Sequence, residues 1–228
     1  MIVLVIDTAL GLCTAAVFED DRPLAIRSEP MNKGHQERIG GLVRDVVAEA
    51  GVGFDGLDRI GVTTGPGSFT GLRVGLAFAQ GLGAALDRPV IGISTLAALA
   101  RSADDLAGAV AAVIDARRGQ VYIQRFRDGA AVSAPEALPL AEATQALSHD
   151  AWRLVGSGGP VLADQSPDLP VGAVAPLAGP TPAALAALTQ AADPDTAPPS
   201  PLYLRAPDAT PPTRLPGQPR AVAPAVTP

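Results

Sequence analysis

Apolar and polar positions in the first fifty residues form three short apolar runs followed by one amphipathic stretch. The run Ile2–Ile6 is apolar throughout and ends at Asp7, which is typical of a strand buried on both faces. Two runs within 14–28, separated by the polar turn around Asp20, predict a β-hairpin. Over 35–50 the apolar residues fall three and four positions apart, so this segment is predicted to be a helix.

The next segment alternates strand and helix around a glycine-rich loop. Residues 59–63 are predicted to form a strand that leads into the sequence TTGPGSFTGLR, residues 63–73. A helix over about 70–86 follows, and then a strand at 89–93 and a second helix capped near Ser94. The loop is therefore expected between the end of a strand and the start of a helix.

The second half of the chain echoes this order with shorter elements. A strand at 109–114 ends at Asp115, as the first strand ends at Asp7, and an alternating strand at 120–126 follows. The remaining elements are a helix, a strand, a glycine loop and a helix, predicted over 141–147, 153–155, 156–159 and 183–192. Because strand, carboxylate, hairpin, helix, strand and glycine loop occur twice in this order, we infer an internal duplication.

A duplicated β-β-β-α-β-α unit, with a carboxylate at the end of each first strand, predicts an α/β protein of the actin-like (ribonuclease-H-like, ASKHA) fold. We expect an N-terminal subdomain over 1–105 and a smaller C-terminal subdomain over 106–205. From 206 to 228 the chain is rich in proline and cannot supply a core, so we expect a flexible tail there.

Composition and charge narrow the class of protein. The 228 residues carry a formal net charge of -6, with a single lysine at Lys33, and the arginines are scattered apart from Arg117 and Arg118. A chain that grips nucleic acid by itself usually presents a basic face, so we expect a partner to hold any nucleic acid. The single cysteine, Cys13, suits a reducing compartment, and no apolar run has the length of a membrane span. We therefore expect a cytoplasmic protein.

The glycine loop has the position of an anion-binding site, because the N–H groups and dipole of a helix N-terminus favour negative charge. The groups that would surround a nucleotide or another anion are Asp7, Gly65, Gly67, Ser68, Thr70 and Gly71. The Walker pattern is missing, because no Lys-Ser or Lys-Thr follows Gly71, and the glycines do not have the spacing of a dinucleotide fingerprint. Ser68 is a poor candidate nucleophile, because it lies outside a G-x-S-x-G motif.

The helix after the loop carries a small residue at every fourth position, namely Gly71, Gly75, Ala79 and Gly83. A glycine inside a helix costs about 1 kcal/mol relative to alanine, so we expect close packing against this stripe to offset the cost. The packing partner is either a second subunit or the chain's own second domain, and the pattern alone favours neither. If a second subunit packs here, Gly75→Leu is expected to leave a folded monomer that no longer binds it.

No metal-binding residues are predicted. A zinc-type H-x-x-x-H helix that starts at His35 would need a histidine where Ile39 stands, so we expect a capping or surface role for His35. Asp7 and Asp115 either bind Mg²⁺ together between the domains or accept hydrogen bonds from turn amides. The second interpretation is favoured, because no further acidic residues join them.

Several motifs together resemble the TsaB (YeaZ) family. They are MIVLVIDTALGLCTAAV, GHQERIGGLV, VTTGPGSFTGLRVGLAFAQGLGAAL, GISTLAALA, VIDARRGQVYIQRF and PLYLR, spread from Met1 to Arg205. The resemblance implies an actin-like fold without catalytic residues or activity of its own. It also implies a role beside TsaD, a paralogue that transfers a threonylcarbamoyl group to the adenosine next to the tRNA anticodon, and beside the ATPase TsaE.

The resemblance further implies that TsaD, or a second copy of the chain in its absence, binds the two N-terminal helices. On this sequence the surface comprises His35, Arg38, Leu42, Leu72, Gly75, Leu76, Ala79 and Gly83. ATP or ADP and metal are expected on the partner subunits, and tRNA is expected to be contacted only through them. Two alternatives stay open: an ATP-using enzyme of the same fold, with nucleotide between Asp7 and the loops 65–71 and 156–159, and a metallopeptidase of the glycoprotease type.

Overall fold

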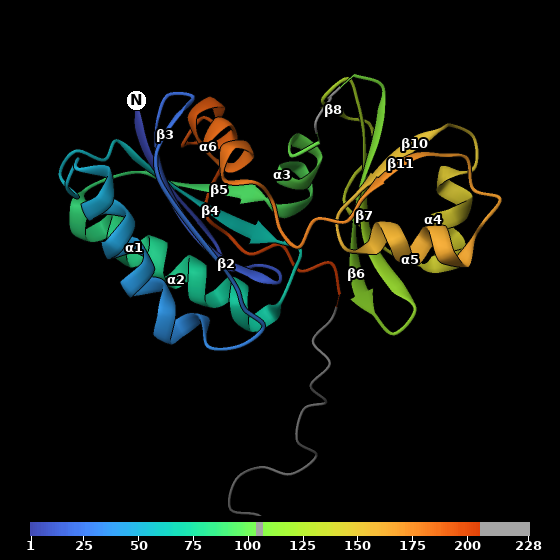
Figure 1. Cartoon of the computed structure of the whole chain (residues 1–228), viewed down its shortest axis with the longest axis horizontal. Helices are drawn as coiled ribbons and strands as arrows, with labels where there is room; N and C mark the ends of the chain where they lie inside the picture. Colours follow the sequence, from blue (N-terminus) through green and yellow to red (C-terminus); the bar gives the residue numbers. More distant parts are fainter. Residues whose placement is uncertain (104–106, 206–228) are drawn as a thin grey trace, which may run out of the picture.

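Two β-sheets lie side by side, each with helices on its faces, in the computed structural model of the chain (Figure 1). The structure describes residues 1–103 and 107–205. The proline-rich tail predicted for 206–228 lies outside the described residues. We call the sheet formed by the N-terminal residues, with its helices, the first lobe, and the other sheet with its helices the second lobe.

The first sheet has the strand order β3-β2-β1-β4-β5. Its strands are β1 (Ile2–Asp7), β2 (Leu12–Glu19), β3 (Arg22–Pro30), β4 (Arg59–Gly65) and β5 (Val90–Ser94). The first three strands pair antiparallel, whereas β1, β4 and β5 run parallel. This is the arrangement that the predicted hairpin and the following strand–helix alternation require.

Four helices cover the two faces of the first sheet: α1 (His35–Ala50), α2 (Phe69–Leu86), α3 (Thr95–Arg101) and α6 (Pro182–Ala191). The side chains of β1 alternate between the faces, as strand geometry requires. Leu4 and Ile6 belong to the core under α1 and α2, whereas Val3 and Val5 pack with Leu185 of α6. Both faces of β1 are therefore buried, which explains its uninterrupted apolar sequence.

The second sheet has the order β11-β10-β6-β7-β8, with β9 paired to β7. Its strands are β6 (Ala109–Arg117), β7 (Gln120–Arg127), β8 (Ala130–Ala131), β9 (Glu136–Pro139), β10 (Trp152–Val155) and β11 (Val171–Ala175). Its helices are α4 (Leu140–Leu147) and α5 (Gly158–Gln165). The sequence β6-β7-β9-α4-β10-α5 reproduces β1-β2-β3-α1-β4-α2, so the predicted duplication and fold class are confirmed.

Some short elements of the second lobe could not be predicted from the pattern of apolar and polar residues. The predicted glycine loop 156–159 is partly helical, because α5 already begins at Gly158. A Cβ atom there would lie 2.6 Å from Cγ1 of Val113, so glycine is needed for α5 to pack on β6. Among the described strands, β11 pairs with β10 alone, and its three central residues are exposed, which leaves no apolar alternation to detect.

The helix α6 crosses from the second half of the chain onto the first lobe. The expected subdomain 106–205 contains α6, yet Leu185 and Ala186 pack with Val3 and Val5 of β1. The segment after α6, residues 193–205, continues over the same lobe, and we call it the C-terminal strap. Its Ala197 carbonyl accepts from the Gly92 N–H at 2.9 Å, and its Leu202 N–H donates to the Thr64 carbonyl at 2.8 Å. Both halves of the sequence thus build the first lobe.

Candidate functional site

The glycine loop makes the turn from β4 into α2, and its polar groups are used within the chain. The Ser68 hydroxyl caps α2 by accepting from the Gly71 N–H at 3.3 Å. The Ser68 N–H donates to the Ala9 carbonyl at 2.7 Å, and the Leu72 N–H donates to the Ser68 carbonyl at 2.9 Å. Three of the backbone N–H groups that an anion would need are therefore already hydrogen-bonded.

Close backbone contacts account for the glycines of the loop. A Cβ atom on Gly67 would lie 2.4 Å from the Ala9 carbonyl oxygen, and one on Gly65 would lie 2.8 Å from the Leu202 carbonyl oxygen. Gly65 also has a φ angle of 111°, which side-chain-bearing residues rarely adopt. The loop is packed between the turn after β1 and the C-terminal strap, and these contacts need glycine without any bound anion.

Asp7, the carboxylate at the end of β1, is 0% exposed. Its Oδ1 accepts from the Thr63 hydroxyl at 2.7 Å and from the Ala9 N–H at 2.9 Å, as expected for a carboxylate that satisfies turn amides. Burial raises the pKa of Asp7, because desolvation penalises the charged form more than these hydrogen bonds favour it. Within the described ranges, its Oδ2 and the Nε2 of buried His35 are without hydrogen-bond partners.

A cleft of about 480 Å³ lies between the lobes, and Asp115 lines it while Asp7 does not. Asp115 Oδ1 accepts from the Arg117 N–H at 2.8 Å, and its Oδ2 lies 3.2 Å from the guanidinium of Arg117. Asp115 thus also serves its own turn, and the structure does not bring the two carboxylates together around one ion. Among the described residues, no three His, Cys, Asp or Glu side chains are placed to hold a metal.

The residues predicted to form the partner surface mostly face the chain's own sheet. Seven of the eight are buried: His35, Leu42, Leu72, Gly75, Leu76, Ala79 and Gly83. Arg38 alone is partly exposed, and it pairs with Glu29 of β3. The expected capping or surface role for His35 is wrong, because His35 is buried at the first residue of α1 and the helix has no side-chain cap there.

The stripe of small residues on α2 is needed for packing on the first sheet. A Cβ atom on Gly75 would lie 2.4 Å from Oγ1 of Thr8, and one on Gly83 would lie 2.3 Å from Cγ2 of Val90. The Thr8 hydroxyl also donates to the Gly71 carbonyl at 2.8 Å. Neither a second subunit nor the second lobe covers this stripe. The spacing correctly indicated close approach, but it carried no information about which neighbour approaches.

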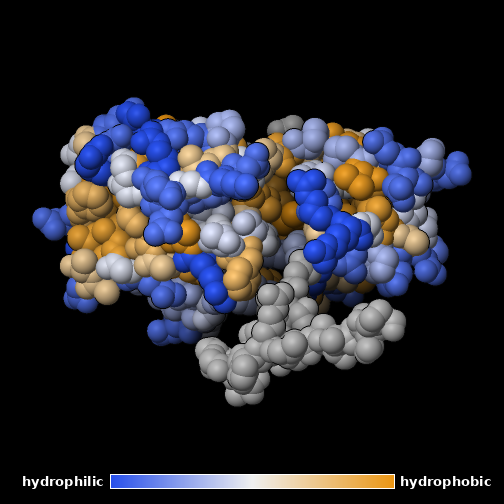
Figure 2. Space-filling view, turned by 90° about the horizontal axis from the view of Figure 1, so that it is seen from below, coloured by the Kyte–Doolittle hydropathy of each residue, from blue (hydrophilic) through white to orange (hydrophobic). Residues whose placement is uncertain are grey.

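A different side of α2 faces outward. We call it the outer face; it comprises exposed Ala77, Gly81, Ala84 and Ala85 with half-buried Val74, Phe78 and Leu82. Seen from below, hydrophobic side chains gather over the part of the molecule that carries α1 and α2 (Figure 2). The edge of Phe78 approaches Gly40 of α1, where an added Cβ would lie 3.6 Å from its ring. Val74, Phe78 and Leu82 also pack against the core of the first lobe, so alanine and glycine make up the exposed part of the outer face.

The helix α2 combines buried, half-buried and exposed positions. Among the described residues, α2 is the one helix whose length and composition would suit a membrane span, although Thr70, Arg73 and Gln80 interrupt its apolar sequence. Core helices of soluble proteins satisfy the same test, and α2 is one layer of the first lobe. Of its eighteen residues, six are buried and eight are exposed, among them polar Thr70, Arg73 and Gln80, so only part of the helix is open to a partner.

Comparisons with known proteins agree with this architecture. The family model described as TsaD, tRNA N6-adenosine threonylcarbamoyltransferase, matches residues 26–153. The tRNA threonylcarbamoyladenosine biosynthesis protein TsaB of Escherichia coli is 38% identical over 170 residues, which are 69% of this chain and 72% of that protein. An uncharacterized protein of Mycobacterium tuberculosis is 35% identical over 212 residues, 92% of this chain and 94% of its own.

A solved structure shows the same fold over nearly its whole length. YeaZ from Pseudomonas aeruginosa superposes with a TM-score of 0.72 at 28% identity, covering 89% of this chain and 99% of that one. With its two duplicated lobes and the helix arrangement described above, the protein is a member of the actin-like class of α/β proteins. Within that class the chain belongs to the TsaB (YeaZ) family.

Two glycines on opposite sides of α2 provide a matched test of the packing. Gly75→Ala is expected to lower the free energy of unfolding by about 1–3 kcal/mol, because its methyl group collides with Thr8. Gly81→Ala is expected to raise it by about 1 kcal/mol, because an added Cβ meets no atom within 4 Å and alanine favours the helix. Urea unfolding measures both; equal effects of the two substitutions would contradict this packing. Gly75→Leu is therefore expected to unfold the protein, and not to leave the folded monomer that was expected from the sequence.

The buried carboxylate predicts a pH dependence. Because the folded-state pKa of Asp7 is raised, its contribution to stability is fully present below the unfolded pKa of about 3.9 and is lost as pH rises through the folded pKa. Asn does not titrate, so the unfolding free energy of Asp7→Asn relative to wild type is expected to improve as pH rises above about 4. Urea midpoints across pH measure this trend, with exposed Asp168→Asn as the control. A difference that is constant with pH would argue against the raised pKa.

Proposed function

We propose that this chain is the non-catalytic subunit of a complex that forms threonylcarbamoyladenosine in tRNA, and that it supports a TsaD-type transferase by docking against it. The observation that carries the proposal is its membership in a family whose E. coli and Bacillus subtilis members are named tRNA threonylcarbamoyladenosine biosynthesis proteins. The uncovered apolar outer face of α2 supports the docking role, because such a surface is stabilised by a protein partner.

The side chains that would serve catalysis have structural roles, which supports a non-catalytic subunit. The Ser68 hydroxyl caps α2 and the Asp7 Oδ1 accepts two hydrogen bonds inside the lobe. His35 is enclosed at the start of α1 and does not reach the interlobe cleft. On this proposal, ATP or ADP and any metal are bound by the partner subunits, including the ATPase TsaE.

The proposed docking surface is the outer face of α2 with the neighbouring surface of α1. Ala77, Gly81 and Ala84 present almost no side chain, so the backbone of a partner helix can approach α2 closely. Exposed charges on α1, such as Glu37 and Arg44, would form the polar rim of such an interface. In the absence of the transferase, a second copy of the chain would occupy the same surface. The complex is proposed to work in the cytoplasm, where its tRNA substrate is found.

Reconstitution tests the function directly. Modification of an unmodified tRNA by the transferase, TsaE and the donor-forming enzyme is expected to fall to background when this chain is omitted. The modified nucleoside is quantified by mass spectrometry after digestion of the tRNA. Equal product with and without the chain would refute the supporting role, and product from this chain without the transferase would show that it is the enzyme.

A charged residue on the outer face tests the docking surface. Gly81→Arg is expected to abolish co-purification with the transferase, because the long cation must be buried in the interface. It should not lower the stability of the subunit, because Gly81 is exposed and arginine favours a helix over glycine. Ala130→Arg, at an exposed position of β8 in the second lobe, is the matched control and should bind normally. Normal binding by Gly81→Arg would place the interface elsewhere.

A further inference from the structure

Two exposed aromatic rings stack at the N-terminal end of α2. Phe69 is 46% exposed and Tyr203 of the C-terminal strap is 42% exposed, with ring centroids 5.3 Å apart. The Arg73 guanidinium lies 3.9 Å from the centroid of the Phe69 ring, and its Nε donates to the Tyr203 hydroxyl at 3.1 Å. These three side chains, which we call the aromatic platform, are held by one another while their outer surfaces stay open to solvent.

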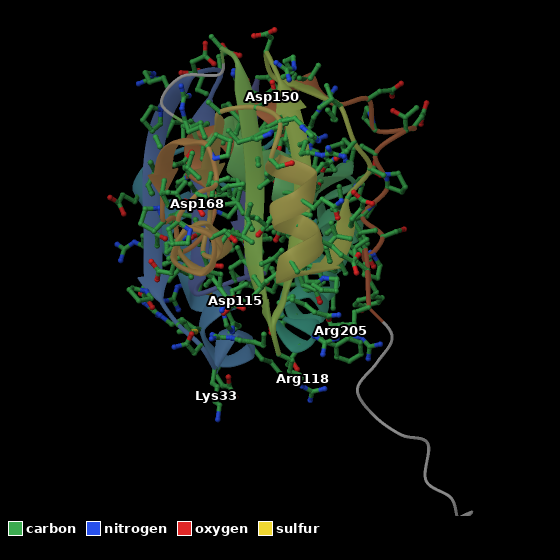
Figure 3. The ribbon with its side chains drawn as sticks, turned by 90° about the vertical axis from the view of Figure 1, so that its right-hand side faces the viewer. Lys33, Asp115, Arg118, Asp150, Asp168 and Arg205 are labelled. Atoms are coloured by element: carbon green, nitrogen blue, oxygen red, sulfur yellow. The ribbon has the colours of Figure 1, made fainter. Side chains whose placement is uncertain are left out.

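Positive charge gathers at one end of the molecule although the chain as a whole is acidic. Lys33, Arg118 and Arg205 lie at the same end of the molecule (Figure 3). Arg205 is two residues from Tyr203, and its Nη1 donates to the Ala116 carbonyl at 3.0 Å. With Arg117 these residues form what we call the basic cluster. Asp115, paired with Arg117, offsets one of its four positive charges.

The turn between β6 and β7 holds two arginines in an unfavourable backbone conformation. Arg117 has a φ angle of 64° and Arg118 one of 55°, a region that favours Gly, Asn and Asp. The side chain of Arg117 is 85% exposed, so packing does not explain the choice of arginine there. Strained residues of this kind are concentrated at functional sites. The turn therefore indicates a function for positive charge at this end of the molecule.

We propose that the aromatic platform and the basic cluster bind a single-stranded RNA loop. Unstacked bases would lie on Phe69 and Tyr203, and phosphates would contact Lys33 and the arginines, which is how proteins commonly hold single-stranded RNA. The inference rests on the proposed function, because the adenosine beside the anticodon lies in such a loop. It goes beyond the expectation that tRNA is contacted only through the partner subunits.

Charge distinguishes this surface from the docking surface. The outer face of α2 exposes alanine and glycine, as suits a protein helix, whereas the platform includes the Arg73 guanidinium and is followed in the chain by Arg205. The N-terminus of α2, directly under Phe69, adds the positive end of a helix dipole. Aromatic faces stack with bases, and positive charges bind phosphates, so the two kinds of group together suit a single-stranded nucleic acid.

The test is an RNA titration of the full-length chain, alone and in complex with its transferase, at several salt concentrations. The probe is a fluorescent anticodon stem-loop RNA with unmodified adenosine. Phe69→Ala and Tyr203→Ala are each expected to weaken binding roughly five- to hundred-fold with an unchanged salt dependence, because stacking is lost. Tyr203→Phe should retain most of the affinity. Ile26→Ala, at an exposed position of β3, is the matched apolar control and should bind as wild type.

Arg118→Asn separates loss of binding from loss of folding. Asparagine accepts the left-handed conformation, so the turn should keep its backbone, and thermal unfolding measures the stability of the variant. Its RNA affinity should fall, and the slope of log K against log salt should become shallower by about 0.7 if one phosphate contact is lost. Weaker binding by a protein of undiminished stability supports a direct contact with the phosphate.

Three results would overturn the inference. The platform variants could bind the stem-loop as tightly as wild type. An RNA duplex of equal length could compete equally, which would indicate unspecific electrostatic attraction. The variants could lose transferase binding while RNA affinity is unchanged, which would make the platform a protein interface. The reconstitution assay keeps the two proposals apart, because a chain that is dispensable for modification refutes the function whatever its RNA affinity.

Discussion

The close packing of α2 on the first sheet determines which residues of this helix lie on the protein surface. Thr8, directly after β1, donates its hydroxyl hydrogen to the Gly71 carbonyl, and its oxygens occupy the space where side chains of Gly71 and Gly75 would stand. Because this contact fixes the helix in rotation as well as in depth, it also determines which residues of α2 face solvent. The outer face and the position of Phe69 are both consequences of it.

The return of the chain onto the first lobe is the second constraint. Helix α6 covers one face of the sheet, and the C-terminal strap then bonds to Gly92 in the middle of β5 through Ala197 and to Thr64 near the end of β4 through Leu202. The strap places Tyr203 against Phe69 and anchors Arg205 on the second lobe at Ala116. Tyr203, near the end of the described chain, thereby shares a surface with Phe69 of the glycine loop.

The two proposed surfaces lie along the same helix and differ in chemistry. The outer face of α2 carries small apolar side chains, whereas the N-terminal end of the helix carries the aromatic platform, at the same end of the molecule as the basic cluster. A subunit with this arrangement would bind a transferase along the helix and leave the platform available to the RNA loop that the transferase modifies. Such a subunit would contribute to catalysis by positioning, which does not require reactive side chains of its own.

The sequence by itself determined the order of the elements in the first lobe, the duplication and the family. These are recorded in local periodicity, as in β1 and α1, and in motifs such as the glycine loop, whereas β11 lacked a pattern because it is an exposed edge strand. The sequence also showed that small residues on α2 require close packing. Only the tertiary structure decided that Thr8 and Val90 provide it, and that Tyr203 meets Phe69 across 134 positions of the chain. A pattern of small side chains indicates that another element packs closely against the helix. The long-range topology of the chain determines which element that is.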